Sequence, residues 1–229
     1  MSSALPKLKS DGAGVGEHAA PNWGVSLVPR AAMSLRRGDA LFRAGEPALN
    51  AYFLDSGWTA LQRLSAAGRS FTLAWCEQGA ALGLAETLLG LPYQATAIMV
   101  TAGAVRRVTQ QELRAQLRAG GRPAEGLMEA LSRSWNEMAD RLAALGLADS
   151  APQRLAHFVL EWAAEDGHRP PLRHEEIAAQ CGLARETVSR LVSEWRRNGI
   201  AAVRGGRAVV RDHARLVEIE AQGWHRTTV

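Results

Sequence analysis

The stretch Ile177-Ala-Ala-Gln-Cys-Gly-Leu-Ala-Arg-Glu-Thr-Val-Ser-Arg-Leu-Val-Ser-Glu-Trp195 predicts two short helices joined by a tight turn at Gly182. The second helix has two opposed faces. Apolar residues at i, i+3, i+4 and i+7 form a stripe that is expected to face a core: Val188, Leu191, Val192 and Trp195. The opposite face carries side chains that can hydrogen-bond to base edges in a DNA major groove: Arg185, Glu186, Ser189 and Arg190. This pattern is typical of a helix-turn-helix whose second helix contacts DNA.

Positive charge is concentrated in and after this stretch. The whole chain has a formal net charge of +4. Between Arg185 and Arg215, eight arginines stand against Glu186, Glu194 and Asp212, which leaves an excess of five positive charges. An isolated run of this kind is more often a solvated face. Beside a two-faced helix, it favours contact with DNA phosphates.

The composition is that of an ordinary globular chain. Its 229 residues, 47% hydrophobic and 22% charged, suit one large or two small domains. Cys76 and Cys181 form no pair or metal motif, which suits a reducing, cytoplasmic location. No apolar run approaches the roughly 18 residues of a membrane span, and the N-terminus lacks the features of a signal peptide. Residues 1–20 are rich in Gly, Ala and Ser and are predicted to be a disordered tail.

Short apolar runs separated by turn signals fill the stretch from about residue 21 to 108. The runs lie at 51–54, 57–61, 71–75 and 96–100, with turn signals at 37–39, 45–47, 55–57, 67–68 and 78–79. Frequent short strands with regular turns predict a small antiparallel barrel or jelly roll. We therefore assign residues 21–121 to an N-terminal, jelly-roll-like antiparallel β-roll. A small β-domain of another kind is the alternative.

A long helix is predicted at about 123–145, after a short helix at 109–117 that ends at Gly120 and Gly121. Apolar residues in the long helix are spaced 3, 4, 3, 4 and 3 apart, as in the a/d seam of a heptad repeat: Met128, Leu131, Trp135, Met138, Leu142 and Leu145. A helix packed only on its own domain uses a wider stripe, so the narrow seam favours self-association. We assign residues 122–147 to a dimerisation helix, and a two-fold dimer suits palindromic DNA.

Residues 148–229 are predicted to form a winged helix-turn-helix domain. Its first helix begins after Asp149 or Ser150, with Pro152 in the first turn. After the two helices quoted above, the runs 200–203 and 208–211 flank a Gly-Gly turn and predict a β-hairpin, the wing. A last short helix follows at about 213–221. The chain as a whole is therefore predicted to be α+β.

The run Arg185-Glu-Thr-Val-Ser-Arg190 resembles the opening of the recognition helix in the Crp–Fnr superfamily of bacterial transcription regulators. The spacing of Glu186, Ser189 and Arg190 is similar to the Fnr-like branch, and that of Arg185 to Arg190 also fits the Crp branch. The run from Arg37 to Glu46 resembles the opening of the cyclic-nucleotide-binding-like β-roll of that family. The resemblance extends from about residue 35 to 212. It implies a homodimer that binds double-stranded DNA, with RNA polymerase as a candidate further partner.

Each polar residue of the recognition helix has an expected role. Arg185 and Arg190 match guanine or an adjacent phosphate. Glu186 can accept from cytosine N4 or adenine N6 and, at i, i+4, can hold Arg190 in place. Ser189 is a short contact near a thymine methyl group. By resemblance, each half-site is TTGA-like and the two form an inverted repeat one helical turn apart. Five side chains are candidate phosphate contacts: Arg173, His174, Thr187, Arg204 and Arg207. For Arg204 and Arg207, a solvated wing tip is the open alternative.

The resemblance weakens at the site of the cyclic nucleotide. In the cyclic AMP binders of the family, a Gly-Glu segment and an Arg-Ser pair hold the ribose and the phosphate. Here the segment starts at Gly83, and the positions of Glu, Arg and Ser are Leu84, Gln94 and Ala95. A buried phosphate without a cation is costly, so cyclic AMP is not expected to bind in the family mode. Two alternatives stay open: an unidentified, less charged effector with Tyr93, Gln94 and Thr96 as polar handles, or a roll filled by its own side chains.

Other chemistries have little support in the sequence. An iron–sulfur cluster of the Fnr type needs four cysteines, and one subunit has two. Cys76 is either a haem ligand or, more commonly, a buried core thiol. No metal site or catalytic constellation stands above chance, so we do not expect an enzyme. Two competing functions remain: a regulator that needs no ligand, and a cyclic-nucleotide-like signalling or binding protein with a vestigial helix-turn-helix.

Overall fold

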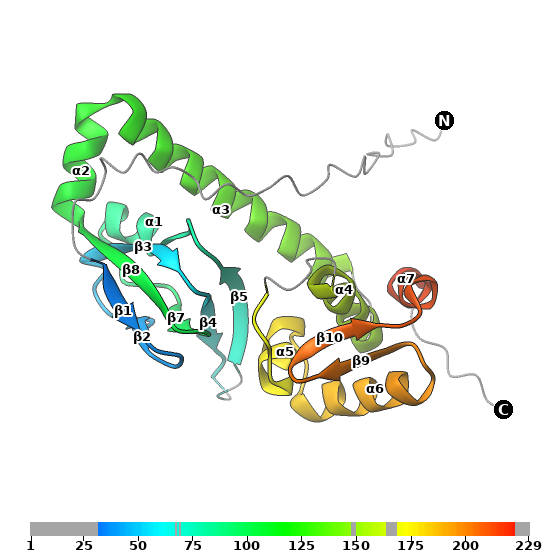
Figure 1. The fold of residues 1–229 in the computed structure, drawn as a ribbon. Coiled ribbons are helices and arrows are strands. Elements are labelled where there is room, and N and C mark those ends of the chain that lie inside the picture. Colours follow the sequence, from blue (N-terminus) through cyan, green and yellow to red (C-terminus); the bar gives the residue numbers. More distant parts are fainter. Residues whose placement is uncertain (1–31, 67, 69, 148–149, 164–168, 223–229) are drawn as a thin grey trace, which may run out of the picture.

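The computed structural model describes residues 32–222 except 67, 69, 148–149 and 164–168. The predicted disordered tail at 1–20 and the predicted cap at Asp149 lie outside these residues. The described part has a β-roll at the N-terminal end, a long helix alongside it and a winged helix at the C-terminal end (Figure 1). The prediction of an α+β chain with this order of parts is confirmed.

Two four-stranded antiparallel sheets form the β-roll. One has the order β1-β8-β3-β6 and the other β2-β7-β4-β5. The strands are β1 (Met33–Leu35), β2 (Ala40–Phe42), β3 (Asn50–Ser56), β4 (Thr59–Leu64), β5 (Ser70–Cys76), β6 (Ala81–Leu82), β7 (Thr96–Met99) and β8 (Gly103–Thr109). The core between the sheets is apolar and includes Phe42, Leu54, Leu82, Met99 and Val105.

A close approach of two turns explains one glycine of the roll. Gly103, at the start of β8, lies against the end of β3, where a Cβ atom would stand 2.1 Å from the carbonyl oxygen of Ser56. Since real Cβ atoms do not approach backbone so closely, any larger residue would push the two strands apart. At Gly103, therefore, glycine is a steric requirement.

Helix α1 (Leu84–Leu89) was not among the predicted elements. Its six residues are too few to show a helical period. The helix is delimited instead by Gly83 and Gly90, both left-handed, with φ of 67° and 71°. Its apolar side, with Leu84, packs against the roll and against Leu113 of the next helix.

Helix α2 (Gln110–Ala119) begins with a complete capping box. The Thr109 hydroxyl accepts from the Glu112 backbone N–H at 3.3 Å, and the Glu112 carboxylate accepts from the Thr109 N–H at 2.7 Å. Helix α3 (Gly121–Leu147) then runs along the roll towards the winged helix (Figure 1). Its buried residues Leu127 and Ala130 pack on the cluster that contains Leu113. This contact fixes which side of α3 faces its own roll.

The winged helix consists of four helices and a two-stranded hairpin among the described residues: α4 (Ala151–Ala163), α5 (His174–Cys181), α6 (Arg185–Arg197), β9 (Ala201–Arg204), β10 (Arg207–Val210) and α7 (His213–Gln222). The predicted stripe of α6 is buried, with Trp195 and Val188 both 0% exposed. It packs on Leu155 and Phe158 of α4 in one core. The same core continues into the roll, where it includes Ala60 and Val100.

Candidate DNA interface

Helices α5 and α6 form the predicted helix-turn-helix. Gly182 ends α5 in the left-handed conformation, with φ of 63°, and donates its N–H to the Ala178 carbonyl. The turn is closed by a second bond, 2.9 Å long, from the Leu183 N–H to the same carbonyl. Glu186 lies in the first turn of α6 and Arg196 and Arg197 in the last, which suits the helix dipole. Local chemistry and the buried stripe therefore specify the same helix.

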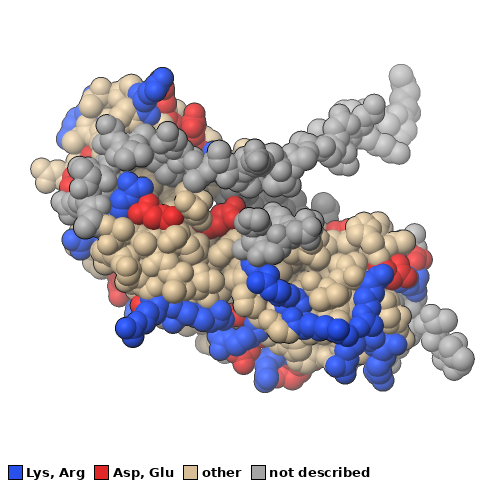
Figure 2. All heavy atoms as spheres, viewed as in Figure 1, with Lys and Arg blue, Asp and Glu red and all other residues tan. Residues whose placement is uncertain are grey.

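The face of α6 opposite the core is open to solvent. Arg185, Glu186 and Arg190 are exposed, and Thr187 and Ser189 are partly buried. In Figure 2, basic side chains gather over α6 and the wing. Both lysines of the chain, Lys7 and Lys9, lie outside the described residues, so all these basic side chains are arginines. The four predicted base contacts thus share one accessible face, within an arginine-rich surface.

Two of those four side chains are held by the preceding helix. The Arg185 Nε lies 3.6 Å from Glu175 Oε1. The His174 Nδ1 lies 2.9 Å from the Ser189 hydroxyl oxygen, and the imidazole tautomer decides which of them donates. The sequence pattern predicts Glu186 as a partner of Arg190, but it gives no sign that Glu175 lies beside Arg185. Spacing within one helix identifies i, i+4 neighbours, whereas the α5–α6 angle that brings Glu175 to Arg185 is set by packing.

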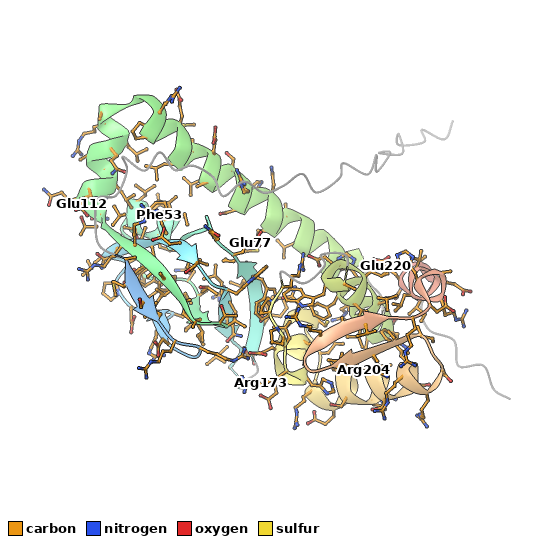
Figure 3. The ribbon with its side chains drawn as sticks, viewed as in Figure 1. Phe53, Glu77, Glu112, Arg173, Arg204 and Glu220 are labelled. Atoms are coloured by element: carbon orange, nitrogen blue, oxygen red, sulfur yellow. The ribbon has the colours of Figure 1, made fainter. Side chains whose placement is uncertain are left out.

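The predicted phosphate contacts surround α6 from three elements. Arg173 is the N-cap of α5 and its side chain is 69% exposed. Arg204 and Arg207 lie on the wing strands, and the Arg207 guanidinium donates to the Arg169 carbonyl at 3.3 Å. Arg173 and Arg204 are labelled in Figure 3. Between α5, the wing turn and the roll lies an open hollow of about 620 Å³, lined by Arg173, His174 and Arg185 among others. A phosphate placed there would meet several cationic or hydrogen-bonding side chains.

The wing turn is pinned to the segment before α5. The Leu172 N–H donates to the Gly206 carbonyl at 2.7 Å. A Cβ atom on Gly206 would stand 2.9 Å from the Leu172 nitrogen, and Gly205 and Gly206 both have positive φ. Position 206 requires glycine, because the backbone conformation and the close contact both exclude a side chain there. The wing therefore has a defined position beside α6.

Tyr93, one of the residues of the predicted effector pocket, is buried and packed against neighbouring side chains. The Tyr93 ring stacks on Phe42, with centroids 3.9 Å apart, and its hydroxyl donates to the Asn50 carbonyl at 2.5 Å. A Cβ atom on Gly83 would lie 2.6 Å from the ring. Tyr93, Leu84 and Ala95 are 4%, 3% and 5% exposed. Of the two alternatives, an effector pocket and a roll filled by its own side chains, these contacts favour the second.

The other two predicted polar handles have hydrogen-bond partners within the roll. Gln94 is exposed and donates to the Pro92 carbonyl at 3.0 Å. The Thr96 hydroxyl accepts from the Ala44 N–H at 3.0 Å. Cys76, the candidate haem ligand, is half-buried and packs against the roll core. In the described residues, no group of three or more His, Cys, Asp and Glu side chains is arranged to hold a metal ion.

The buried tyrosine gives the fold a testable pH dependence. Burial, followed by the charge of nearby Tyr52, raises the pKa of Tyr93 from 10.0 to about 12. Since the folded pKa lies above the unfolded pKa, the stabilisation is complete below pH 10 and is lost as the pH rises from about 10 to about 12. We expect the free energy of unfolding to fall in this window, and to fall less in Tyr93→Phe. Urea unfolding at a series of pH values measures the difference.

Tyr52 limits the size of that difference, because burial also raises its pKa and it continues to titrate in the variant. Below pH 10, Tyr93→Phe should cost about 1 kcal/mol, because the Asn50 carbonyl loses its donor. Identical curves for the two proteins above pH 10 would contradict the assignment of the pH dependence to Tyr93.

Three residues of the predicted dimer seam lie on the free side of α3. Met128, Trp135 and Leu142 are 66%, 72% and 61% exposed in the single chain. Leu131 and Met138 are partly buried, and the side chain of Leu145 lies outside the described residues. Leu131 packs, together with the buried residues Leu127 and Ala130, against the cluster that α3 shares with its own roll. No described helix is both long and apolar enough to cross a membrane.

The architecture, a cyclic-nucleotide-binding-like β-roll followed by a winged helix, is that of a transcription regulator. Comparison with protein families agrees: residues 32–119 match the cyclic nucleotide-binding domain and residues 153–219 the Crp-like helix-turn-helix domain. The chain belongs to the Crp–Fnr superfamily of transcription regulators.

Individual relatives support the same assignment. The cyclic AMP receptor protein of Thermus thermophilus is 28% identical over 184 residues, which cover 80% of this chain and 85% of that protein. The transcriptional activator protein FnrL of Cereibacter sphaeroides is 51% identical over 49 residues, or 21% of this chain and 20% of its own. A solved CRP-family transcriptional regulator from Thermus thermophilus has a TM-score of 0.70 at 26% identity, and covers 83% of this chain and 97% of its own.

Proposed function

We propose that this regulator is a homodimer that binds an inverted repeat of TTGA-like half-sites through Arg185, Glu186, Ser189 and Arg190. The observation that carries the proposal is the two-faced helix α6. One side is fixed in the core by Trp195 and Val188, and the other presents three exposed charged side chains. Arginine forks match guanine O6 and N7, and a carboxylate accepts from cytosine or adenine amino groups.

The phosphate contacts would come from Arg173, His174, Thr187, Arg204 and Arg207. They lie at the start of α5, near the start of α6 and on the wing, and two of them, Arg173 and His174, line the open hollow. Such contacts position a protein on DNA without distinguishing sequences. They also predict a steep dependence of affinity on salt, because each neutralised phosphate releases counterions.

Dimerisation would use the exposed seam of α3. Large exposed apolar side chains on one side of a helix indicate an interaction surface, and Met128, Trp135 and Leu142 recur at seven-residue intervals. A two-fold axis along α3 would give each subunit one half-site. The seam supports a second copy of this chain as the partner.

Cyclic AMP binding of the family type is not part of this proposal, although several relatives are named for it. Tyr93 stands against Gly83, where that mode needs room for the ligand, and Leu84 and Ala95 are buried. Gln94 stands at the position of the family's phosphate-binding arginine, so no cation is available there for a cyclic phosphate. A regulator active without this ligand is therefore favoured over one that requires it.

Fluorescence anisotropy of the purified, additive-free protein tests the proposal. The DNA is an inverted TTGA-type repeat, compared with a scrambled duplex over a salt series. We expect selective binding of the repeat, with affinity that falls steeply as salt rises, and no change on addition of cyclic AMP. Binding that is weak and equal on both duplexes at every salt concentration, with or without cyclic AMP, would favour the alternative of a signalling protein with a vestigial helix-turn-helix.

A further inference from the structure

The outer face of the sheet β2-β7-β4-β5 is apolar where a free-standing roll would meet water. We call this the docking face; its members are Trp58, Ala60, Phe71, Trp75 and Val100. Ala60 and Val100 belong to the buried core of the winged helix, and Trp58 and Trp75 pack against that core. A large apolar surface of this kind indicates that another part of the protein packs on it. Its occupant is the winged helix of the same chain.

Aromatic side chains make the centre of the contact. Trp162 of α4 lies between the two tryptophans of the docking face, with ring centroids 6.2 Å from Trp58 and 5.4 Å from Trp75. Phe71 lies beside the turn of the helix-turn-helix, where a Cβ atom on Gly182 would come within 3.4 Å of its ring. The roll therefore contacts both α4 and the α5–α6 turn.

Two polar contacts fix α5 on this face. The Trp75 indole N–H donates to the Gln180 Oε1 at 2.5 Å. The Arg37 guanidinium donates to the Val100 carbonyl and to Glu176 Oε1, both at 2.7 Å. Glu176 is only 13% exposed, so its carboxylate depends on its partners more than a surface group would. These bonds hold α5 near both of its ends.

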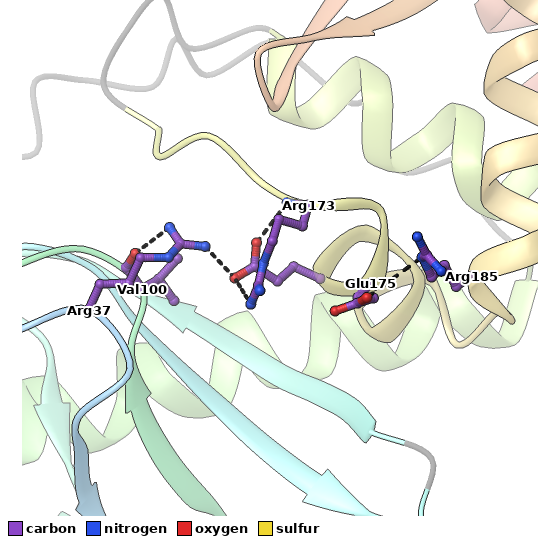
Figure 4. A network of polar contacts seen from close by, with 6 residues as sticks. Arg37, Val100, Arg173, Glu175 and Arg185 are labelled. Atoms are coloured by element: carbon purple, nitrogen blue, oxygen red, sulfur yellow. Dashed lines mark hydrogen bonds and ion pairs between the residues drawn. The ribbon is translucent and has the colours of Figure 1, made fainter.

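The contacts continue from the roll to the recognition helix (Figure 4). Glu176 also lies 3.5 Å from Arg173 and accepts from the Arg173 N–H at 2.7 Å. The neighbouring Glu175 pairs with Arg185 at the start of α6. A displacement of α5 from the roll would therefore move residues proposed to contact phosphates and bases.

A rigid attachment matters for a protein that must match two half-sites at once. The recognition helices of a dimer face successive major grooves only when they are held about 34–36 Å apart. If each winged helix moves freely, DNA binding must pay the entropy of fixing both at this distance. The affinity for the preferred spacing then falls towards the affinity for other spacings. A fixed seat on the roll removes this freedom before DNA arrives.

We propose that Arg37 and Trp75 are positioning residues for DNA recognition: they seat α5 on the roll and so fix the spacing between the two recognition helices of the dimer. This inference rests on the proposed function. It assigns to the roll of this chain a structural part in site selection that needs no bound ligand.

The test compares wild type with the double variant Arg37→Ala/Trp75→Ala. Anisotropy is measured on inverted repeats whose spacer changes one base pair at a time, and on a duplex with a single half-site. For wild type we expect one preferred spacing. For the variant we expect at least about tenfold weaker binding at that spacing, a flatter dependence on spacing, and single-half-site affinity within about twofold of wild type.

Three controls separate positioning from loss of fold or charge. Arg43→Ala removes the same charge from an exposed site in the turn after β2, and should leave the spacing preference unchanged. Arg37→Lys keeps the cation beside Glu176 but loses the planar fork, and should recover part of the preference. Hydrogen–deuterium exchange at the α5 amides should accelerate in the double variant while circular dichroism and α6 exchange stay near wild type.

Three outcomes would count against the inference. An unchanged spacing profile together with faster α5 exchange would show that the contact does not position the recognition helix. Tighter binding by the variant would show that the seat restrains DNA binding. A wild-type protein that binds no duplex would refute the proposed function, and the positioning role with it, while the exchange data would still report on the α5 contact.

Discussion

Arg190→Ala is expected to abolish most of the preference for the inverted repeat over a scrambled duplex. A bidentate arginine–guanine contact is worth about 1–3 kcal/mol, and a dimer loses one in each half-site, or about 2–6 kcal/mol in total. This corresponds to a loss of affinity of at least about thirtyfold. Stability should change little, because Arg190 lies on the exposed side of α6, away from the core. Anisotropy titrations with both duplexes at one salt concentration measure the effect.

Arg118→Ala is the matched control, since it removes an exposed arginine from the last turn of α2 in the roll. Its effect on selectivity should be negligible. If Arg190→Ala weakened binding to the repeat and to the scrambled duplex by the same factor, Arg190 would be a phosphate contact. In that case, the salt dependence should also become shallower by roughly one released counterion per subunit.

Trp135→Glu combined with Leu142→Glu is expected to convert the protein to monomers at micromolar concentration. Both side chains are more than half exposed in the single chain and lie one heptad apart on α3. In a two-fold dimer, the substitutions would place like charges in an apolar seam, which is strongly unfavourable. Loss of the second subunit should lower affinity for the inverted repeat by about 10²–10⁴, to the level of a single half-site.

Sedimentation velocity and the same anisotropy assay give the two readouts. Leu89→Glu is the control, because this leucine is 70% exposed at the end of α1, on another part of the roll. It should leave both the dimer and the DNA affinity intact. A double variant that stays dimeric with unchanged secondary structure would show that α3 is not the subunit contact.

The sequence predicted those parts of the structure in which a periodic pattern and a local signal coincide. Trp195 and Val188 were assigned to the core from spacing alone, and the wing turn from Gly205 and Gly206. Contacts between elements were beyond the same reasoning. Glu175 reaches Arg185 only through the angle between two helices, and Trp75 reaches Gln180 across a boundary between two domains. Neither geometry is encoded in a spacing along the chain.

For the predicted effector pocket, the sequence could predict only part of the outcome. Substitutions at Leu84, Gln94 and Ala95 sufficed to predict the loss of one known ligand mode. They could not decide whether the space was left for another ligand, because that depends on where the Tyr93 ring turns. Packing against Phe42 and a bond to Asn50 direct it inwards. The decisive information was the rotamer of one side chain.

The core shared by the roll and the winged helix also has a consequence for chimeric proteins in which one of these domains is exchanged. The two family matches end at residue 119 and resume at residue 153, as if a boundary lay between exchangeable parts. Here, Trp162 of the winged helix packs on Trp58 and Trp75 of the roll, so a winged helix grafted onto another roll would leave Trp162 without these contacts. A functional chimera would have to carry the docking face with it. Exchange of this chain's domains is therefore constrained by a surface outside both the proposed DNA contacts and the predicted effector pocket.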